Sequence, residues 1–132
     1  MTEEQIQIMC SDWMNIRYPE LSKLYFFNSF QGMRLNFGQK KKKKKTGGLK
    51  TGLPDFMFLK NNGTYSSLFI ELKKESPYLK IGIPNNQIRN DEHLQLQNDV
   101  IQQLKLEGHY ACFAWSFDQF KKIVTDYMEN KL

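Results

Sequence analysis

The most constraining feature of the sequence is a turn signal between two short apolar runs. Residues 56–59 and 68–70 are apolar, and Asn61-Asn62-Gly63 lies between them. An Asn-Gly pair favours the backbone conformation of a tight turn, so the segment predicts a β-hairpin centred near Gly63. Neither run alternates cleanly between apolar and polar residues. We therefore expect both faces of the hairpin to be covered, as in a sheet with helices packed around it.

Two acids and a lysine flank this hairpin. Asp55 precedes Gly63 by as many residues as Glu71 follows it, so a turn centred on Gly63 places the two acids opposite each other. Directly opposed residues on one face have Cβ atoms about 5 Å apart. Lys73 is two residues after Glu71 on the same strand and projects to the same face. The spacing predicts that Asp55, Glu71 and Lys73 cluster at one edge of the sheet.

Opposed carboxylates repel each other, and a divalent cation would remove that repulsion. Hard oxygen ligands suit Mg²⁺ or Mn²⁺, and such an ion polarises a phosphoryl oxygen and lowers the pKa of a bound water. The simpler interpretation is that Asp55 is a turn residue and that Glu71 and Lys73 form an exposed pair. Against it, Glu71 lies within the apolar segment 68–72, where an unpaired charge is expensive.

The remaining patterns predict a single α/β domain over residues 1–132. Thr2 can cap a first helix that carries Glu3 and Glu4 in its first turn. After the hairpin, residues 75–90 read as a loop. The other expected elements, in chain order, are a strand at 24–27, a helix at 91–107, a strand at 110–115, and a helix from Ser116 to about 130. This order is typical of one mixed sheet with helices around it.

The charge balance points to a polyanionic partner. The net charge is +5 and the pI is about 9.2, which favours nucleic acid or an anionic membrane surface. No run of about 18 apolar residues could span a bilayer, and the first residues do not resemble a signal peptide. Cys10 and Cys112 lie in apolar patterns and are expected to be buried and reduced. We expect a cytoplasmic protein that is not secreted.

An unbroken lysine run precedes the hairpin. A run of six can be a solvated helix face, a disordered tract, or a clamp on the DNA backbone; we favour the clamp, because the run leads directly toward Asp55. Segment 40–52 is accordingly expected to be a basic, flexible DNA-contacting segment. Such contacts position DNA without reading its sequence. The lysines concerned are Lys40, Lys41, Lys42, Lys43, Lys44, Lys45 and Lys50.

Several of these motifs together resemble a known nuclease family. Gly52-Leu53-Pro54-Asp55 followed by Glu71-Leu72-Lys73 resembles the PD-(D/E)xK nuclease superfamily. The order of a Glu-bearing helix, a basic stretch, these two motifs and a Gln-bearing helix resembles its VRR-NUC (virus-type replication–repair nuclease) family. Segment 104–120 also resembles the tail of that family. The resemblance covers nearly the whole chain and implies a restriction-endonuclease-like domain with a mixed central sheet flanked by helices.

The resemblance implies a role for each matching residue. Asp55 and Glu71 would be metal ligands, and Lys73 would be the catalytic lysine. Glu3, with Glu4 as the less favoured choice, would reach the metal directly or through water. Gln97 would lie near the catalytic lysine. It also has independent support, since it shares an apolar helical face with Leu94, Ile101 and Leu104, although that position also suits a residue at the solvent boundary.

The resemblance implies a metal-dependent DNA endonuclease that uses Mg²⁺ or Mn²⁺. Stand-alone members of this size resemble structure-specific enzymes of phage or prophage recombination and repair, which act on branched DNA such as four-way junctions. Two symmetric cuts imply a homodimer. The alternatives are a catalytically silent nucleic-acid-binding module and a sequence-specific restriction nuclease. The chain departs from the family at residues 75–90 and at the start of the glutamine helix, where Asp91 or Asn90 replaces a serine-type cap. His93 and His109 are expected not to be metal ligands.

Overall fold

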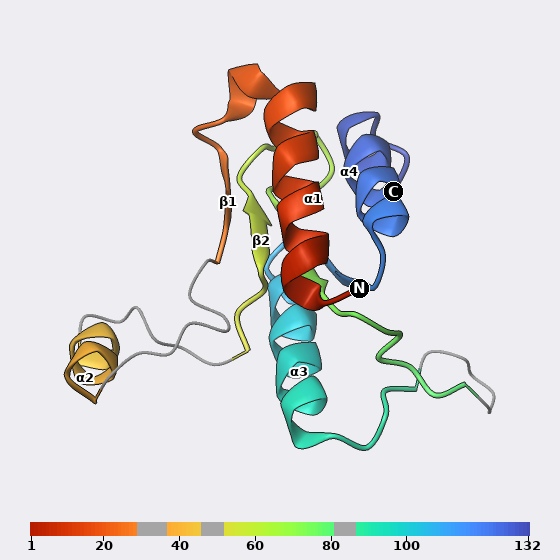
Figure 1. Cartoon of the computed structure of the whole chain (residues 1–132). Helices are drawn as coiled ribbons and strands as arrows, with labels where there is room; N and C mark the ends of the chain where they lie inside the picture. The colour runs from red at the N-terminus through yellow and green to blue at the C-terminus, as the bar shows by residue number, and fades with distance from the viewer. Residues whose placement is uncertain (29–36, 46–51, 81–86) are drawn as a thin grey trace.

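The computed structural model describes residues 1–28, 37–45, 52–80 and 87–132. The described chain combines short strands with longer helices (Figure 1). The elements are α1 (Glu3–Arg17), the 3-10 helix η1 (Pro19–Leu21), β1 (Tyr25–Phe27), α2 (Phe37–Lys45), β2 (Phe56–Phe58), β3 (Leu68–Leu72), α3 (Glu92–Leu106), β4 (Tyr110–Ala114) and α4 (Phe117–Met128).

The strands form one mixed sheet in the order β1-β2-β3-β4. β1, β2 and β3 are antiparallel neighbours, and β4 is parallel to β3. Phe56 pairs with Ile70 and Phe58 with Leu68, so the β2–β3 hairpin is centred on Gly63 as predicted. Gly63 adopts a positive φ of 94°, which a glycine reaches without strain. The expectation of a single mixed α/β sheet is confirmed.

The sheet has a hydrophobic core on each face, because successive residues of a strand point to opposite sides. Leu68, Ile70 and Leu72 of β3 pack in the core that α1 and α4 cover. Phe69 packs in a second core with Leu94 and Ile101 of α3 and with Ala111 and Phe113 of β4. Glu71 follows Phe69 by two residues, so it faces the α3 side of the sheet. The expectation that both faces are covered is confirmed.

Side chains at the helix starts fix where α1, α3 and α4 begin. The Thr2 side chain accepts a hydrogen bond from the Gln5 amide, and the Gln5 side chain accepts one from the Thr2 amide. Asp91 caps α3 through the Leu94 amide, which decides between the two caps considered from the sequence. The Ser116 hydroxyl caps α4 through the Gln119 amide. Each cap satisfies an amide that the helix itself leaves without a partner.

The lysine run differs from the sequence expectation. Residues 40–45 belong to helix α2, whereas a flexible segment was predicted over 40–52. Lysine has a good intrinsic helix propensity, so a lysine run does not by itself oppose a helix. Residues 46–51, which include Lys50, lie outside the described residues.

The expected loop over residues 75–90 contains regular backbone pairing at its base. Tyr78 and Ile88 form an isolated β-bridge, and Arg89 donates a backbone hydrogen bond to Pro77. Residues 81–86 lie outside the description. Both cysteines are free; Cys10 is fully buried as expected, but Cys112 is only partly buried. None of the helices in the described ranges is long and apolar enough to cross a membrane.

Candidate active site

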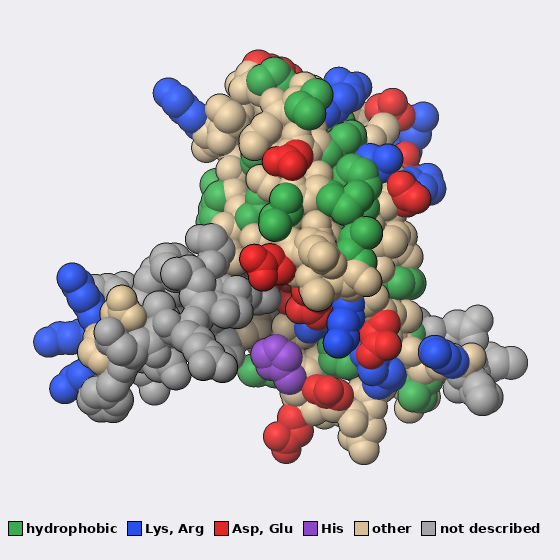
Figure 2. Space-filling model, in the orientation of Figure 1, with side chains coloured by type: hydrophobic (Ala, Val, Ile, Leu, Met, Phe, Trp, Pro, Cys, Tyr) green, Lys and Arg blue, Asp and Glu red, His purple; other side chains and the backbone are tan. Residues whose placement is uncertain are grey.

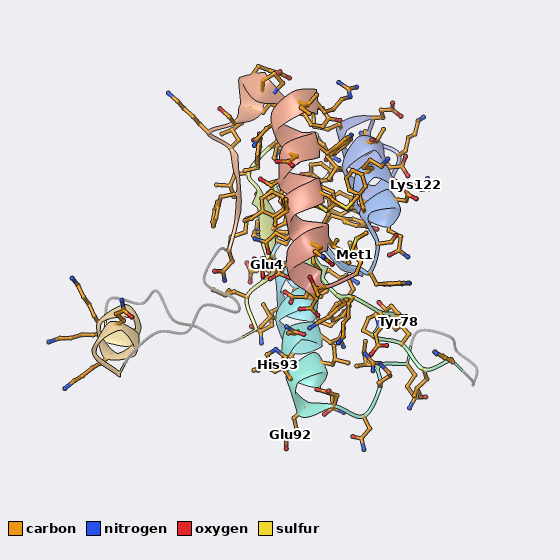
Figure 3. All side chains as sticks on the ribbon, in the orientation of Figure 1. Met1, Glu4, Tyr78, Glu92, His93 and Lys122 are labelled. Carbon is orange, nitrogen blue, oxygen red and sulfur yellow. The ribbon has the colours of Figure 1, made fainter. Side chains whose placement is uncertain are left out.

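Charged side chains gather where the start of α1 approaches α3. Figure 2 shows acidic and basic side chains beside a histidine on this face. Figure 3, drawn from the same side, labels Glu4 in the first turn of α1 and His93 at the start of α3. The residues that the sequence analysis selected on the hairpin lie within this region, in the interior of the protein.

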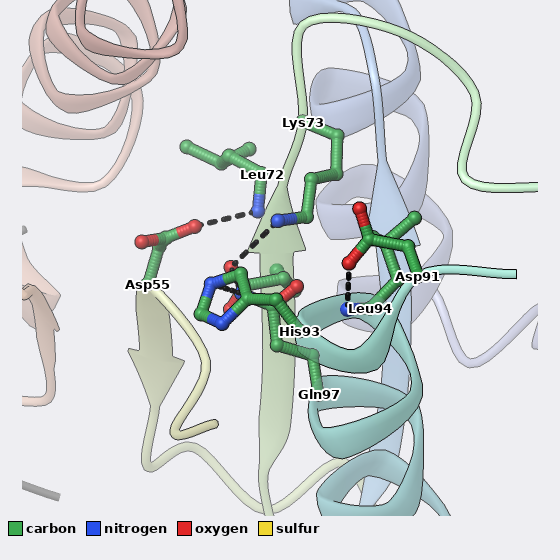
Figure 4. A network of polar contacts seen from close by, with 8 residues as sticks. Asp55, Leu72, Lys73, Asp91, His93, Leu94 and Gln97 are labelled. Atoms are coloured by element: carbon green, nitrogen blue, oxygen red, sulfur yellow. Dashed lines mark hydrogen bonds and ion pairs between the residues drawn. The ribbon is translucent and has the colours of Figure 1, made fainter. Parts of the chain in front are cut away.

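Asp55 is held in place immediately before β2. Its backbone carbonyl accepts a hydrogen bond of 2.6 Å from the Asn28 amide, which continues the pairing of β1 with β2. The β2–β3 register, continued by one residue, places Asp55 opposite Glu71. The Asp55 side chain is buried, and its Oδ2 accepts a hydrogen bond of 2.8 Å from the Leu72 amide (Figure 4). The carboxylate is therefore fixed against the end of β3.

Glu71 and Lys73 project from the end of β3 on the same face. Glu71 is only 1% exposed, although it carries a carboxylate. The Lys73 amide donates to the Ala114 carbonyl at 2.8 Å, which extends the β3–β4 pairing past the end of the strand. The Lys73 ammonium Nζ lies 3.8 Å from Glu71 Oε1 and is itself largely buried. The structure thus brings together the two acids and the lysine that the hairpin spacing predicted to cluster.

Gln97 contributes from α3, across the same face of the sheet. It is buried, and its Nε2 donates a hydrogen bond of 2.8 Å to Glu71 Oε1. Two buried acceptors in this cluster, Glu71 Oε2 and Gln97 Oε1, receive no hydrogen bond from any residue that the structure describes. Buried polar atoms are rarely left without a partner, so these atoms indicate that the cluster receives something from outside the chain.

Burial makes both carboxyl groups hard to ionise. Burial raises the pKa of Glu71 to about 9, and the negative charge of Asp55 adds to this shift, while Lys73 opposes it. Burial likewise raises the pKa of Asp55 to about 6, against the lowering effect of its hydrogen bond from Leu72. A cation placed between these groups would favour the ionised form of both.

The first helix brings a third acid near the pair. The charge of Glu3 contributes to the raised pKa of both Asp55 and Glu71, whereas no such effect involves Glu4. Glu3 is partly buried and Glu4 is exposed. Still, no three His, Cys, Asp or Glu side chains within the described ranges already form a metal-binding group. Mg²⁺ commonly takes only one or two carboxylates and keeps several waters, so the buried pair with its unpartnered Glu71 Oε2 fits such an ion.

The lysine run provides an exposed basic surface on α2. Lys41, Lys42 and Lys45 are exposed, and basic side chains stand out from this helix in Figure 2. Lys40, Lys43 and Lys44 belong to the same helix. Lys50 lies outside the described residues.

One member of the cluster was missed by sequence reasoning. His93 Nε2 lies 3.2 Å from Gln97 Nε2, so this histidine borders the site. The signal was the spacing of four residues between His93 and Gln97, which places both on one helical face. His109 does not join the cluster, because its ring packs edge-on against Phe69 with centroids 5.0 Å apart.

Comparisons with known proteins identify the fold. No family model and no curated protein matches the chain. Among solved structures, the chain is similar to a protein described as "VRR_NUC domain protein". The TM-score is 0.68 at 22% sequence identity, and the match covers 98% of this chain and 89% of that one. The chain therefore has the VRR-NUC fold that its motifs predict.

Proposed function

We propose that this protein is a metal-dependent endonuclease that hydrolyses DNA phosphodiester bonds. The observation that carries the proposal is the burial of Asp55, Glu71 and Lys73 in one cluster on the β2–β3 hairpin. Two acids whose pKa values are raised by burial destabilise the fold when they ionise, so their presence calls for a role outside packing. The fold shared with a VRR_NUC domain protein agrees with this reaction class.

Asp55 and Glu71 would hold Mg²⁺ or Mn²⁺, with Glu3 contributing directly or through water. When bound, the ion supplies a Lewis acid for a phosphoryl oxygen and lowers the pKa of a water ligand. The raised pKa values of both acids support this assignment, because a cation favours the ionised carboxylates that burial disfavours. The donor set consists of oxygen atoms, which suits these hard cations.

The side chains around the acids have separate tasks in the proposed hydrolysis. Lys73 orients the attacking water and stabilises the negative charge that develops on the phosphate. Gln97 holds the Glu71 carboxylate in one orientation through its 2.8 Å hydrogen bond. The water oxygen forms a bond to phosphorus, and the bond from phosphorus to the 3′ oxygen breaks. The water gives up one proton, the leaving 3′ oxygen takes one up, and the products are a 3′ hydroxyl and a 5′ phosphate.

We further propose that the whole of residues 1–132 acts as one nuclease domain on branched DNA, such as four-way junctions, in phage or prophage recombination or repair. The lysines of α2 would hold the DNA backbone, since they add positive charge without a means of reading bases. A two-fold homodimer would present two sites for paired cuts. The assignment to junctions rests on the resemblance to VRR-NUC proteins.

A cleavage assay tests the proposal. Linear, flapped and four-way DNA are each incubated with the protein in Mg²⁺, in Mn²⁺ or in chelator. Asp55→Asn keeps an acceptor for the Leu72 amide but removes the charge, and it should abolish cleavage. Asp12→Asn is the matched control, because Asp12 is an exposed aspartate on α1 and the change is the same.

The outcomes separate the proposed function from its alternatives. Metal-dependent cutting that prefers four-way DNA, with Asp12→Asn active and Asp55→Asn inactive, supports the proposal. DNA binding without cutting under every condition favours a catalytically silent binding module. Cutting of plain duplex at one sequence favours a restriction-type nuclease. Cleavage that persists in chelator contradicts the metal requirement.

A further inference from the structure

His93 stands at the solvent side of the buried cluster. It lies in the first turn of α3 and is exposed, whereas Gln97, one helical turn further on, is buried. Figure 4 shows the His93 imidazole near Gln97, on the side of α3 that faces Asp55. The 3.2 Å contact between His93 Nε2 and Gln97 Nε2 links this exposed ring to Glu71 through a single amide group.

The hydrogen bonds of Gln97 determine which imidazole nitrogen carries the hydrogen. Gln97 Nε2 donates one of its two hydrogens to Glu71 Oε1. The second hydrogen on Gln97 Nε2 then points to His93 Nε2, which can accept it only when that nitrogen carries no hydrogen. This contact assigns the hydrogen of the ring to Nδ1, because the bond made by one nitrogen fixes the state of the other.

We propose that His93 contacts the DNA backbone at the active site, with Nδ1–H donating a hydrogen bond to a phosphate oxygen. This inference rests on the proposed nuclease function for the identity of the ligand. The His93 ring contacts Gln97 and is exposed, so it can meet a phosphate that approaches the buried acids from solvent.

One feature favours a phosphodiester at this position. The amide of Leu94, which an anion could otherwise use at the start of α3, is already occupied by Asp91, so it does not compete with the His93 ring for a phosphate oxygen. The unpartnered oxygens Gln97 Oε1 and Glu71 Oε2 suit the proposed cation or its water ligands, because a phosphodiester carries no hydrogen to donate to them. Because the lone pair of His93 Nε2 faces Gln97, His93 is not expected to hold the metal.

The test combines two substitutions at His93 with a control on the same helix. His93→Ala removes the donor, whereas His93→Asn keeps an N–H at nearly the position of Nδ1. Gln95→Ala is the control, since Gln95 is exposed on α3 and makes no side-chain contact with the cluster. A hydrogen bond to a charged phosphate contributes enough that kcat/KM for DNA cleavage should fall about 10–100-fold in His93→Ala. His93→Asn should recover most of this loss, and Gln95→Ala should match the unsubstituted protein.

Two further measurements do not depend on cleavage. Calorimetric titration with Mn²⁺ should give the same affinity for His93→Ala as for the unsubstituted protein. Imidazole ¹⁵N shifts measured by NMR should show hydrogen on Nδ1 of His93, and a short duplex added with Ca²⁺ should shift the Nδ1–H signal. Gln97→Leu should shift the hydrogen toward Nε2 in the DNA-free protein.

Each outcome decides one of the two proposals. If the unsubstituted protein cuts DNA but His93→Ala keeps its kcat/KM, the inference about His93 is wrong and the nuclease function stands. Loss of Mn²⁺ binding in His93→Ala also overturns the inference, because it makes His93 a metal ligand. If no DNA is cut, the nuclease function fails. In that case, a shift of the His93 signals on addition of duplex would still support the proposed contact with the DNA backbone. Unchanged signals would refute that contact.

Discussion

Glu71 is the residue where the requirements of the site and of the fold conflict most directly. It lies at the end of a strand whose five residues are all buried. An apolar residue there would pack against α3 without any need for a partner. Instead the carboxyl group relies on Gln97, Lys73 and a ligand from outside the chain. Proteins commonly tolerate such a local loss of stability at functional sites.

Glu71→Gln should therefore stabilise the metal-free protein at pH 8 while abolishing cleavage. Glutamine keeps an acceptor for Gln97 and is uncharged, whereas Glu71, with a pKa of about 9, must take up a proton when the chain folds at pH 8. Thermal unfolding in chelator should show a higher Tm for Glu71→Gln than for the unsubstituted protein. Glu75→Gln is the control, because Glu75 is exposed and its contact with Arg89 lies at the surface. An unchanged or lower Tm for Glu71→Gln would contradict the raised pKa of Glu71.

The raised pKa values of the acid pair also predict how stability depends on pH. The pKa of Glu71 is about 9 and that of Asp55 about 6 in the folded chain, above unfolded values of roughly 4. The fold thus favours the protonated acids, and their contribution to stability is complete below about pH 4 and is lost as pH rises toward 9. In chelator, Tm should decrease from pH 5 to pH 9. The double variant Asp55→Asn/Glu71→Gln should lose most of this decrease in Tm. If Tm falls with pH equally in the double variant and the unsubstituted protein, the pH dependence does not come from these two acids.

Among the structural elements, the segment leading into β2 depends on Gly52. Gly52 has a φ of 85°, and a Cβ there would lie 3.0 Å from a Val100 methyl group on α3. Gly63 has a similar φ of 94° but nothing within 4 Å of a Cβ. Gly63→Ala should cost about 1–2 kcal/mol, from backbone strain alone. Gly52→Ala should cost at least about 1 kcal/mol more, from overpacking.

Denaturant unfolding of the two alanine variants isolates the contact with α3. Because Gly52 is three residues before Asp55, its displacement should also lower cleavage, whereas Gly63→Ala should cut DNA normally once folded. Equal losses of stability would show that the close approach of Gly52 to Val100 has no energetic consequence. Normal cleavage by Gly52→Ala would show that the position of Asp55 does not depend on this approach.

The hairpin was predictable because its information is local. The Asn-Gly turn and the apolar runs set the centre of the hairpin, and the centre determines which residues oppose each other. The sequence spacing is therefore enough to predict that Asp55 and Glu71 lie opposite each other. Gln97 was identified because a polar residue on an apolar helical face needs a partner. His93 was not identified, since its contact depends on how α3 lies across the sheet. A helix was one alternative for the lysine run, but it was not preferred, because a run of lysines has no apolar stripe to mark it as a packed helix.

Across the whole molecule, the acids of the proposed site and the lysines of α2 occupy different places. The acids of the site are buried between the sheet and α3, while exposed lysines extend along α2 (Figures 1 and 2). A polyanion that approaches along α2 therefore meets positive charge before it meets these buried carboxylates. This arrangement suits long-range attraction of DNA followed by local chemistry. Net charge alone, which is +5, does not distinguish this arrangement from an evenly basic surface.

The salt dependence of DNA binding tests whether the α2 lysines contact phosphates. Lys45 follows Lys42 by three residues and Lys41 by four, so these exposed lysines share one side of α2 and can meet one DNA backbone together. Each phosphate contact contributes about 0.9 to the slope of log K against log salt, so Lys41→Gln/Lys42→Gln/Lys45→Gln should reduce the slope by about 3. Asp55→Asn protein in Ca²⁺ prevents cleavage during the titration. The control, Lys121→Gln/Lys122→Gln/Lys131→Gln, removes equal charge from α4 and the C-terminal residues. It should leave the slope nearly unchanged; an equal reduction in both triple variants would mean that DNA responds to net charge and not to α2.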